Sequence, residues 1–171
     1  ASVADINIIN ADSATGIVTA TATETAAATL IGLTTTGTDA ITVTMAAAST
    51  AAADLNTTDG KTCLAVGATA ITELTGNATD VKTALASSGI TTVTNGSLAV
   101  TVSGSTSVAD INTINADSAT GIVTATVTSA AASVLKLLTT TSTDAITMTV
   151  NAEASGATAA ADLVSLNGKT N

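Results

Sequence analysis

The stretch SVADINIINADSATGIVTAT, residues 2–21, returns as SVADINTINADSATGIVTAT at residues 107–126. The two copies differ only where Ile8 is replaced by Thr113. Self-similarity at a fixed period is the sequence mark of repeat architectures, and it takes precedence over local signals. This repeat therefore decides how the rest of the chain is interpreted.

Beyond this stretch the two copies match more loosely. TTTGTDAITVT (34–44) corresponds to TTTSTDAITMT (139–149), and TAAADLNTTDGKT (50–62) corresponds to TAAADLVSLNGKT (158–170). One long unit thus recurs about 105 residues later. We expect residues 1–171 to form a single repetitive segment, with a long repeat over 2–106, a partial second copy over 107–171 and an irregular insert over about 70–97.

Short helices are predicted within each copy. A Ser or Thr with an Asp a few residues later suits a helix N-terminus, because the hydroxyl caps a free N–H and the acid favours the helix dipole. Such starts are Ser2…Asp5, Thr50…Asp54, Ser107…Asp110 and Thr158…Asp162. Apolar residues at helical spacing are Val3, Ile6 and Ile9, Val108, Ile111 and Ile114, Leu30 and Leu33, and Leu135 and Leu138.

Strict alternation of apolar and polar residues predicts strands. The alternating runs are VTATAT (18–23), ITVTM (41–45), LAVGAT (64–69), LAVTVS (98–103), VTATVT (123–128) and ITMTV (146–150). Most of these runs start roughly 23–25 residues apart, within the range of strand-plus-helix coils. The residues expected to point inward are Val18, Ile41, Val43, Leu64, Val66, Leu98, Val100, Val123, Ile146 and Met148.

Strands separated by a helix must pair in parallel, through right-handed crossovers. The predicted fold is therefore an α/β solenoid of ~23-residue strand-plus-short-helix coils that form one parallel sheet. The rival fold is a β-sandwich, which would need turn signals every 8–12 residues or so. The wider spacing of roughly 23–25 residues between the alternating runs disfavours it. In the insert we expect a strand at 70–74, a helix at 77–86, and a turn at 94–97 that could join 90–94 to 98–103 as a hairpin.

Composition excludes several function classes. The sequence has no His, no aromatic residue and a net charge of −9. Its only basic side chains are Lys61, Lys82, Lys136 and Lys169. Nucleic-acid and anionic-lipid surfaces require clustered positive charge, so neither partner is expected, and no apolar run is long enough to insert into a membrane. Because the common acid–base and nucleophilic arrangements are missing, we do not expect an enzyme, and no cofactor is expected.

Thr residues occupy the outward positions of the predicted strands. On stacked strands they would form Thr-x-Thr rows, although Thr is also simply a good strand former. The rows are similar to those of β-solenoid ice-binding proteins, and they could alternatively pack laterally against a second copy. This candidate surface, the threonine face, comprises Thr19, Thr21, Thr42, Thr44, Thr101, Thr124, Thr126, Thr147 and Thr149.

Calcium is the one metal that the carboxylates could bind, since it prefers oxygen ligands. The candidates are Asp12 with Thr15, Asp117 with Thr120, Asp39, Asp144, and Asp59 beside Gly60. None has the spacing of a known calcium loop, and the same Asp residues suit ordinary turns. The single Cys63 is expected to be a small apolar residue that enters a strand at Leu64.

Neither end of the chain has the polar cap that solenoids usually carry. Residues 2–10 begin directly as a repeat, and residues 169–171 stop where the first copy continues into a strand. We therefore expect a piece of something longer, whose ends are covered by other copies of the same chain. Head-to-tail contacts that do not close produce filaments.

Three phrases resemble repeats in very large Thr- and Ala-rich surface proteins of bacteria, especially marine cyanobacteria. They are VADINTINADSATGIVTATVT (108–128), AAADLNTTDGKT (51–62) and ITELTGNATDVKTALASSGIT (71–91). The resemblance implies an extracellular or cell-surface role as a structural repeat module of a filament, surface layer or adhesin stalk. The alternative is a binding module that uses the threonine rows, either on ice or on a host surface as in a phage fibre.

Overall fold

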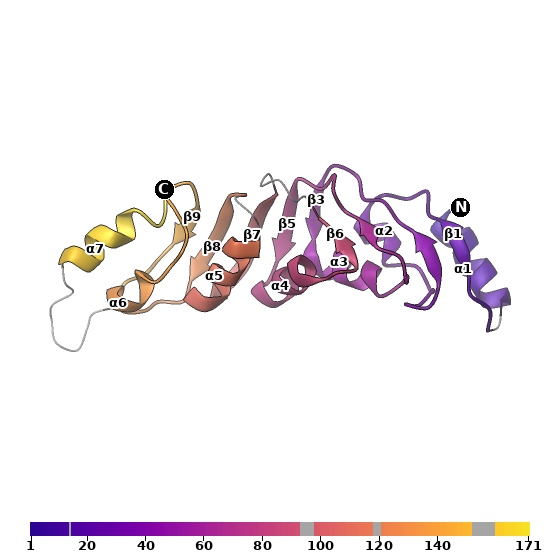
Figure 1. Ribbon diagram of the computed structural model, residues 1–171, viewed down its shortest axis with the longest axis horizontal. Helices are drawn as coiled ribbons and strands as arrows, with labels where there is room; N and C mark the ends of the chain where they lie inside the picture. Colours follow the sequence, from indigo (N-terminus) through magenta and orange to yellow (C-terminus); the bar gives the residue numbers. More distant parts are fainter. Residues whose placement is uncertain (14, 93–97, 118–120, 152–159) are drawn as a thin grey trace.

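The protein is an elongated α/β structure with parallel sheets. The computed structural model describes residues 1–13, 15–92, 98–117, 121–151 and 160–171. The helices follow one another along the long axis in chain order, from α1 at one end to α6 and α7 at the other (Figure 1). Chain order therefore maps onto distance along the molecule.

Short helices recur along the chain. They are α1 (Val3–Asp12), α2 (Ala27–Leu30), α3 (Ala52–Asp59), α4 (Ala78–Ala86), α5 (Val108–Asp117), α6 (Ala132–Leu135) and α7 (Ala160–Asn167). Successive helices lie side by side: α3 packs on α2, α4 on α3, α5 on α4, and α7 on α6. Helices this short are marginal in isolation, so the contacts with their neighbours supply most of their stability.

Two of the predicted helix starts are confirmed. Ser2 and Asp5 form a reciprocal capping box on α1, and the Ser107 hydroxyl accepts the Asp110 N–H at 3.1 Å. The prediction at Thr50 is wrong, because this residue is buried in a strand and α3 begins after Ala51 without a side-chain cap. The predicted start at Thr158 lies outside the described residues.

The strands pair only in parallel in the part of the chain that the structure describes. They are β1 (Thr19–Thr21), β2 (Ala40–Thr42), β3 (Ser49–Ala51), β4 (Val66–Gly67), β5 (Glu73–Gly76), β6 (Ile90–Thr91), β7 (Ala99–Thr106), β8 (Val123–Val127) and β9 (Ala145–Thr147). Each of the six predicted alternating runs contains or overlaps one of them. Parallel pairing across helices confirms the crossover argument.

The single predicted sheet is wrong, because the strands form three separate open sheets. β1 pairs with β2, β4 pairs with β6, and a five-stranded sheet has the order β3-β5-β7-β8-β9. β3 and β5 come directly before helices, whereas β4 and β6 follow helices. We call one helix with its adjoining strands a layer. The layers of α3 and α4 thus each contribute two short strands to two different sheets, whereas β7 and β8, on either side of α5, pair with each other. Alternation alone does not reveal this division.

The irregular insert adds an ordinary layer to the stack. Its helix, α4, begins after the Asn77 cap, close to where the sequence predicts it. β5 starts three residues after the expected strand and ends two residues after it, and it pairs with β3 and β7. The suggested hairpin turn at 94–97 falls outside the described residues. The strands that it would join, β6 and β7, belong to different sheets, so the hairpin pairing is wrong.

Buried aliphatic side chains form one continuous cluster. Most predicted inward residues belong to it, and Met148 packs on it half-buried. Two predictions fail. Leu64 is 40% exposed because β4 begins only at Val66, and Ile9 is 51% exposed although its spacing on α1 suggests a core position. With no aromatic side chain available, each layer contributes only a few aliphatic residues to the core.

Asparagine side chains join successive layers identically in both repeats. Asn7 donates from Nδ2 to the Gly32 carbonyl at 2.8 Å and accepts the Thr34 N–H at 2.8 Å. In the second copy, Asn112 donates to Leu137 at 2.9 Å and accepts the Thr139 N–H at 2.8 Å. An amide can donate and accept at once, so one side chain satisfies two backbone groups that no strand reaches. The repeat in the sequence is therefore a repeat of contacts.

Gly121 marks a close approach between layers. A Cβ built on Gly121 would lie 1.7 Å from the Leu98 carbonyl oxygen, whereas one on the equivalent Gly16 meets nothing closer than 3.5 Å. Gly16 is exposed, and among the described residues its nearest neighbour is the Ser13 carbonyl oxygen of its own layer. Only the second copy, at Gly121, therefore requires glycine at this position of the repeat.

We predict that Gly121→Ala destabilises the protein by about 1–3 kcal/mol, the usual range for forcing an atom into a filled space. Gly16→Ala is the matched control and should change the free energy of unfolding by less than about 0.5 kcal/mol. Urea unfolding followed by circular dichroism measures both. Equal effects of the two substitutions would contradict the close approach.

Candidate functional site

The threonine face is exposed as the sequence predicts. Eight of its nine side chains are exposed, and Thr101 is half-buried. Parallel register places some of them side by side: Thr21 opposite Thr42, Thr101 opposite Thr124, and Thr126 opposite Thr147. Two further residues extend these rows, since Thr75 lies opposite Thr101 and Ser105 opposite Thr126.

The threonine face is nevertheless not one continuous array. Thr19 lies opposite Ala40, Thr44 opposite Gly67, and Thr124 opposite Ala145. Thr19, Thr21 and Thr42 belong to the β1–β2 sheet, and Thr149 lies beyond the end of β9. The longest threonine rows therefore lie on the five-stranded sheet, across β5, β7, β8 and β9.

Glu73 lies beside these rows, opposite Ser49 and Ala99, and sequence reasoning did not single it out. Its carboxylate accepts the Thr101 hydroxyl at 2.6 Å and the Ser49 hydroxyl at 2.8 Å, from the strands on either side. These hydrogen bonds, that of Thr101 first, hold the pKa of Glu73 below its ordinary value. The alternation of Ile71, Glu73 and Thr75 did not reveal it, because its partners come from neighbouring layers.

Asp39 is buried and joins two layers. Its Oδ1 accepts the Val18 N–H at 2.9 Å, and its Oδ2 accepts the Thr36 N–H at 2.8 Å. These two backbone donors, that of Val18 first, hold the pKa of Asp39 below its ordinary value despite burial, which acts in the opposite direction. Residue Asp39 is thus more than the turn residue that the sequence suggests.

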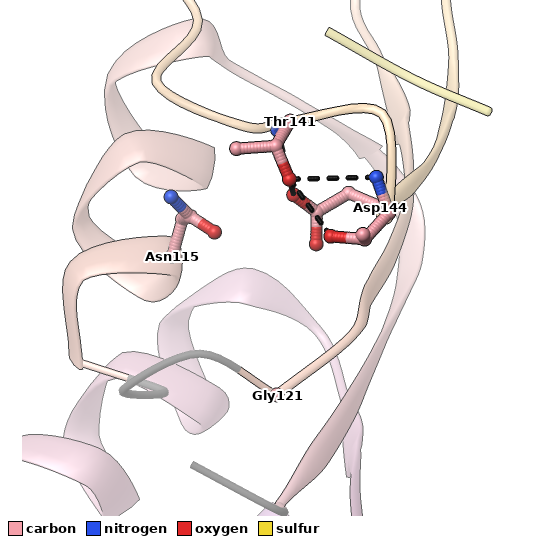
Figure 2. A pocket seen from close by; sticks show the side chains of 5 residues that line it. Asn115, Gly121, Thr141 and Asp144 are labelled. Carbon is pink, nitrogen blue, oxygen red and sulfur yellow. Dashed lines mark hydrogen bonds between the residues drawn. The ribbon is translucent and has the colours of Figure 1, made fainter.

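Asp144 repeats this arrangement in the second copy. It accepts the Val123 N–H at 2.9 Å and the Thr141 N–H at 2.8 Å. Figure 2 shows Thr141 and Asp144 beside a cavity of about 310 Å³ that Asn115 and Gly121 also line. Since both carboxylate oxygens accept backbone N–H groups, the arrangement serves to bind one layer to the next.

The calcium candidates do not converge. The structure brings no three His, Cys, Asp or Glu side chains together as a metal-binding group within the described residues. Asp12 is exposed at the end of α1, and Asp59 accepts the Ser87 hydroxyl at 2.9 Å. Thr120, proposed as a partner of Asp117, lies outside the described residues. The oxygen ligands expected of calcium are therefore spread along the molecule.

Cys63 is exposed in the bend before β4, and its N–H donates to the Asp39 carbonyl at 2.7 Å. The expected entry into a strand at this residue is wrong. Thr62, immediately before it, takes the buried position: its hydroxyl accepts the Ile41 N–H at 3.0 Å and donates to the Ile41 carbonyl at 2.8 Å. A buried hydroxyl therefore displaces the strand start to Val66.

A hollow between α5 and α6 distinguishes the second copy from the first. Its volume is about 480 Å³, and its apolar lining includes Ala130, Val134 and Leu137. Ser129 also lines the hollow, and its equivalent in the first copy is Glu24, whose carboxylate accepts the Val3 N–H at 3.1 Å. The two repeats thus share their layer contacts and differ on this outer surface.

The chain shows no match among protein-family models, curated proteins or solved structures. Within the described residues, the helices are all too short or too polar to cross a lipid bilayer.

Stability should depend on the ionised Asp39. A group whose pKa is lowered in the folded state contributes stability above its unfolded pKa of about 3.9, and that contribution is lost as the pH falls through the folded value. In Asp39→Asn an NH2 group replaces one of the two carboxylate oxygens and cannot accept an N–H group, so one of the two backbone donors loses its partner. We therefore expect the free energy of unfolding at pH 7 to fall by about 1–3 kcal/mol.

Asp39→Asn should also reduce the dependence of the free energy of unfolding on pH in the acid range. Urea unfolding of the wild type and of Asp39→Asn, measured from pH 7 down to about pH 2, tests this. Asp12→Asn, which removes an exposed carboxylate, is the matched control and should behave as the wild type. Parallel pH profiles for the wild type and Asp39→Asn would show that Asp39 does not bind the layers.

Proposed function

We propose that this chain is an extracellular structural repeat module of a filament, surface layer or adhesin stalk, and that copies of it associate end to end. In this proposal its layers are the coils of an α/β solenoid with a repeat of ~23 residues. The hydrogen bonds that join layers support this, because they link residues 21 to 29 apart. The resemblance to surface-protein repeats and the net charge of −9 favour a cell-surface location.

Exposed apolar residues at the two ends carry the proposal. Ile9 in the first layer is 51% exposed, whereas its repeat equivalent, Ile114, is 0% exposed on α5, which packs on α4. Leu163 in the last layer is 47% exposed, whereas its equivalent, Leu55, is 0% exposed on α3, which also packs on α4. This comparison supports the proposal, because a neighbouring layer lies beside the equivalent positions Ile114 and Leu55, which are buried.

End-to-end association gives these residues a partner. Burying an Ile or Leu side chain stabilises a contact by about 1.5–3 kcal/mol. The last layer of one copy also presents Val164, which is 75% exposed on α7. Because the two contacting surfaces of such a pair are different, the association continues in one direction and builds a filament.

We expect the wild type to form linear oligomers whose size grows with concentration, seen by sedimentation velocity and negative-stain microscopy. Ile9→Lys or Leu163→Lys should weaken the association about tenfold or more, as for the central residues of an interface. Ile8→Lys is the matched control, since Ile8 is exposed and its equivalent Thr113 is exposed too. A wild type that stays monomeric at high concentration would refute end-to-end association.

A binding role for the threonine face is the second candidate. The exposed rows on β7, β8 and β9 favour it, because adjacent strands repeat at about 4.8 Å and alternate residues at about 6.6 Å. Such a grid presents hydroxyl and methyl groups to ice or to another regular surface. The interruptions at Ala40, Gly67 and Ala145 limit its extent.

Ice binding would appear as thermal hysteresis of the wild-type solution. Thr126→Tyr should abolish it, because a large ring disrupts the flat row between Ser105 and Thr147. Thr113→Tyr, on the exposed side of α5, should leave it unchanged. Absence of hysteresis in the wild type rules out ice as the ligand.

A further inference from the structure

The hollow between α5 and α6 is a place where the second copy departs from the first. The α5 side of its lining is identical in the two copies, whereas four other lining residues differ. With the first-copy residue given first, these pairs are Glu24 and Ser129, Thr25 and Ala130, Thr29 and Val134, and Gly32 and Leu137. The second copy thus loses an acid and gains aliphatic side chains around the same helix start.

In the first copy a carboxylate binds this helix start. Both carboxylate oxygens of Glu24 lie 3.1 Å from the nitrogen of Val3, the first residue of α1. The first N–H groups of a helix have no partner within the helix, so they attract anions. The Val3 N–H is the main cause that holds the pKa of Glu24 below its ordinary value, and it therefore favours the ionised carboxylate.

In the second copy the same donor has lost its acceptor. Val108, the first residue of α5, matches Val3, but Ser129 stands where the first copy has Glu24. Within the described part of the chain, nothing accepts the Val108 N–H. Val108 and Ser129 both line the hollow, so the place that corresponds to the Glu24 carboxylate lies within it.

The rest of the hollow suits a hydrocarbon chain. Val134 is 44% exposed and Leu137 is 61% exposed, so both can gain cover from a ligand. The volume of about 480 Å³ lies within the usual range of small-molecule sites and exceeds what a carboxylate alone would fill. A ligand that satisfies both parts of the hollow therefore has an anionic head and an apolar tail.

The acid in the first turn of α5 does not prevent anion binding. Asp110 binds the Lys82 ammonium through Oδ1 and accepts the Ser107 hydroxyl at 2.8 Å through Oδ2. The first copy also holds an acid at this position, since Asp5 and Glu24 lie together at the start of α1. One helix start thus accommodates two carboxylates.

We propose that the hollow between α5 and α6 is a binding site for a medium-chain aliphatic carboxylate such as octanoate. The carboxylate accepts the Val108 N–H, as the Glu24 carboxylate accepts the Val3 N–H in the first copy. The hydrocarbon chain packs against Val134 and Leu137. The first copy fills the equivalent place with its own side chain, and the site does not depend on end-to-end association.

The test compares probes and variants by isothermal titration calorimetry, with the Val108 amide resonance followed by NMR. The probes are octanoate, butanoate and octan-1-ol. Ser129→Glu restores the carboxylate of the first copy, and Ser133→Glu adds the same charge at an exposed residue of α6 outside the lining. Val134→Thr introduces the first-copy residue into the apolar wall. Circular dichroism checks the fold of each variant.

Octanoate should shift the Val108 amide resonance and bind about two- to fivefold more tightly than octan-1-ol, because a helix start favours negative charge. It should bind about tenfold or more tightly than butanoate, because it buries more methylene groups. Ser129→Glu should weaken octanoate binding about tenfold, since a tethered carboxylate competes for the same N–H. Val134→Thr should weaken it about threefold, and Ser133→Glu should leave it within about twofold of the wild type.

Glu24→Ser tests whether a helix start is sufficient. This substitution frees the Val3 N–H but leaves Thr29 and Gly32 in place of an apolar wall, so no second octanoate should bind. A second bound octanoate in Glu24→Ser overturns the role of Val134 and Leu137. Absence of octanoate binding to the wild type, equal binding of octan-1-ol, or equal effects of Ser129→Glu and Ser133→Glu overturns the site itself.

Discussion

The buried carboxylates of Asp39 and Asp144 hold successive layers together. Each accepts one N–H from its own turn and one from the strand of the preceding layer, so a single side chain fixes the register between them. Burying a charge is costly unless hydrogen bonds compensate it, and here backbone donors compensate it on both oxygens. The Thr-rich turns hold these acids in place, since Thr36 and Thr141 donate their N–H groups to Asp39 and Asp144.

Layer contacts matter because the core is thin. Without aromatic residues, burial comes from Ile, Val, Leu, Met and Ala, a few per layer, and stability then becomes a sum of short-range contacts between neighbours. Asn7, Asn56 and Asn112 add further polar contacts between layers to those of the two acids. Adding layers makes such a molecule longer without changing its cross-section, which suits a structural module. It also leaves residues such as Ile9 exposed wherever the stack stops.

Much of the architecture was predictable because it is local. Alternation located every predicted strand to within a few residues, and Ser2 with Asp5 correctly marked a helix start. Failures occurred where long-range contacts override local signals. Thr50 is a residue type that often caps helices, but it lies in β3 and pairs with β5. Leu64 continues an alternating pattern, but the strand begins only after it, because the buried hydroxyl of Thr62 bonds the neighbouring backbone. Glu73 escaped notice for the same reason, since its hydroxyl partners come from two other layers.

The sequence by itself determined the repeat, the parallel pairing and the outward threonines, because period and alternation are properties of the chain alone. Tertiary structure decided how strands divide among three sheets, which acids are buried and which apolar residues remain uncovered. Those outcomes depend on what lies in the adjacent layer. Ile9 and Ile114 occupy identical local sequence, and only the presence of α4 beside one of them makes it part of the core.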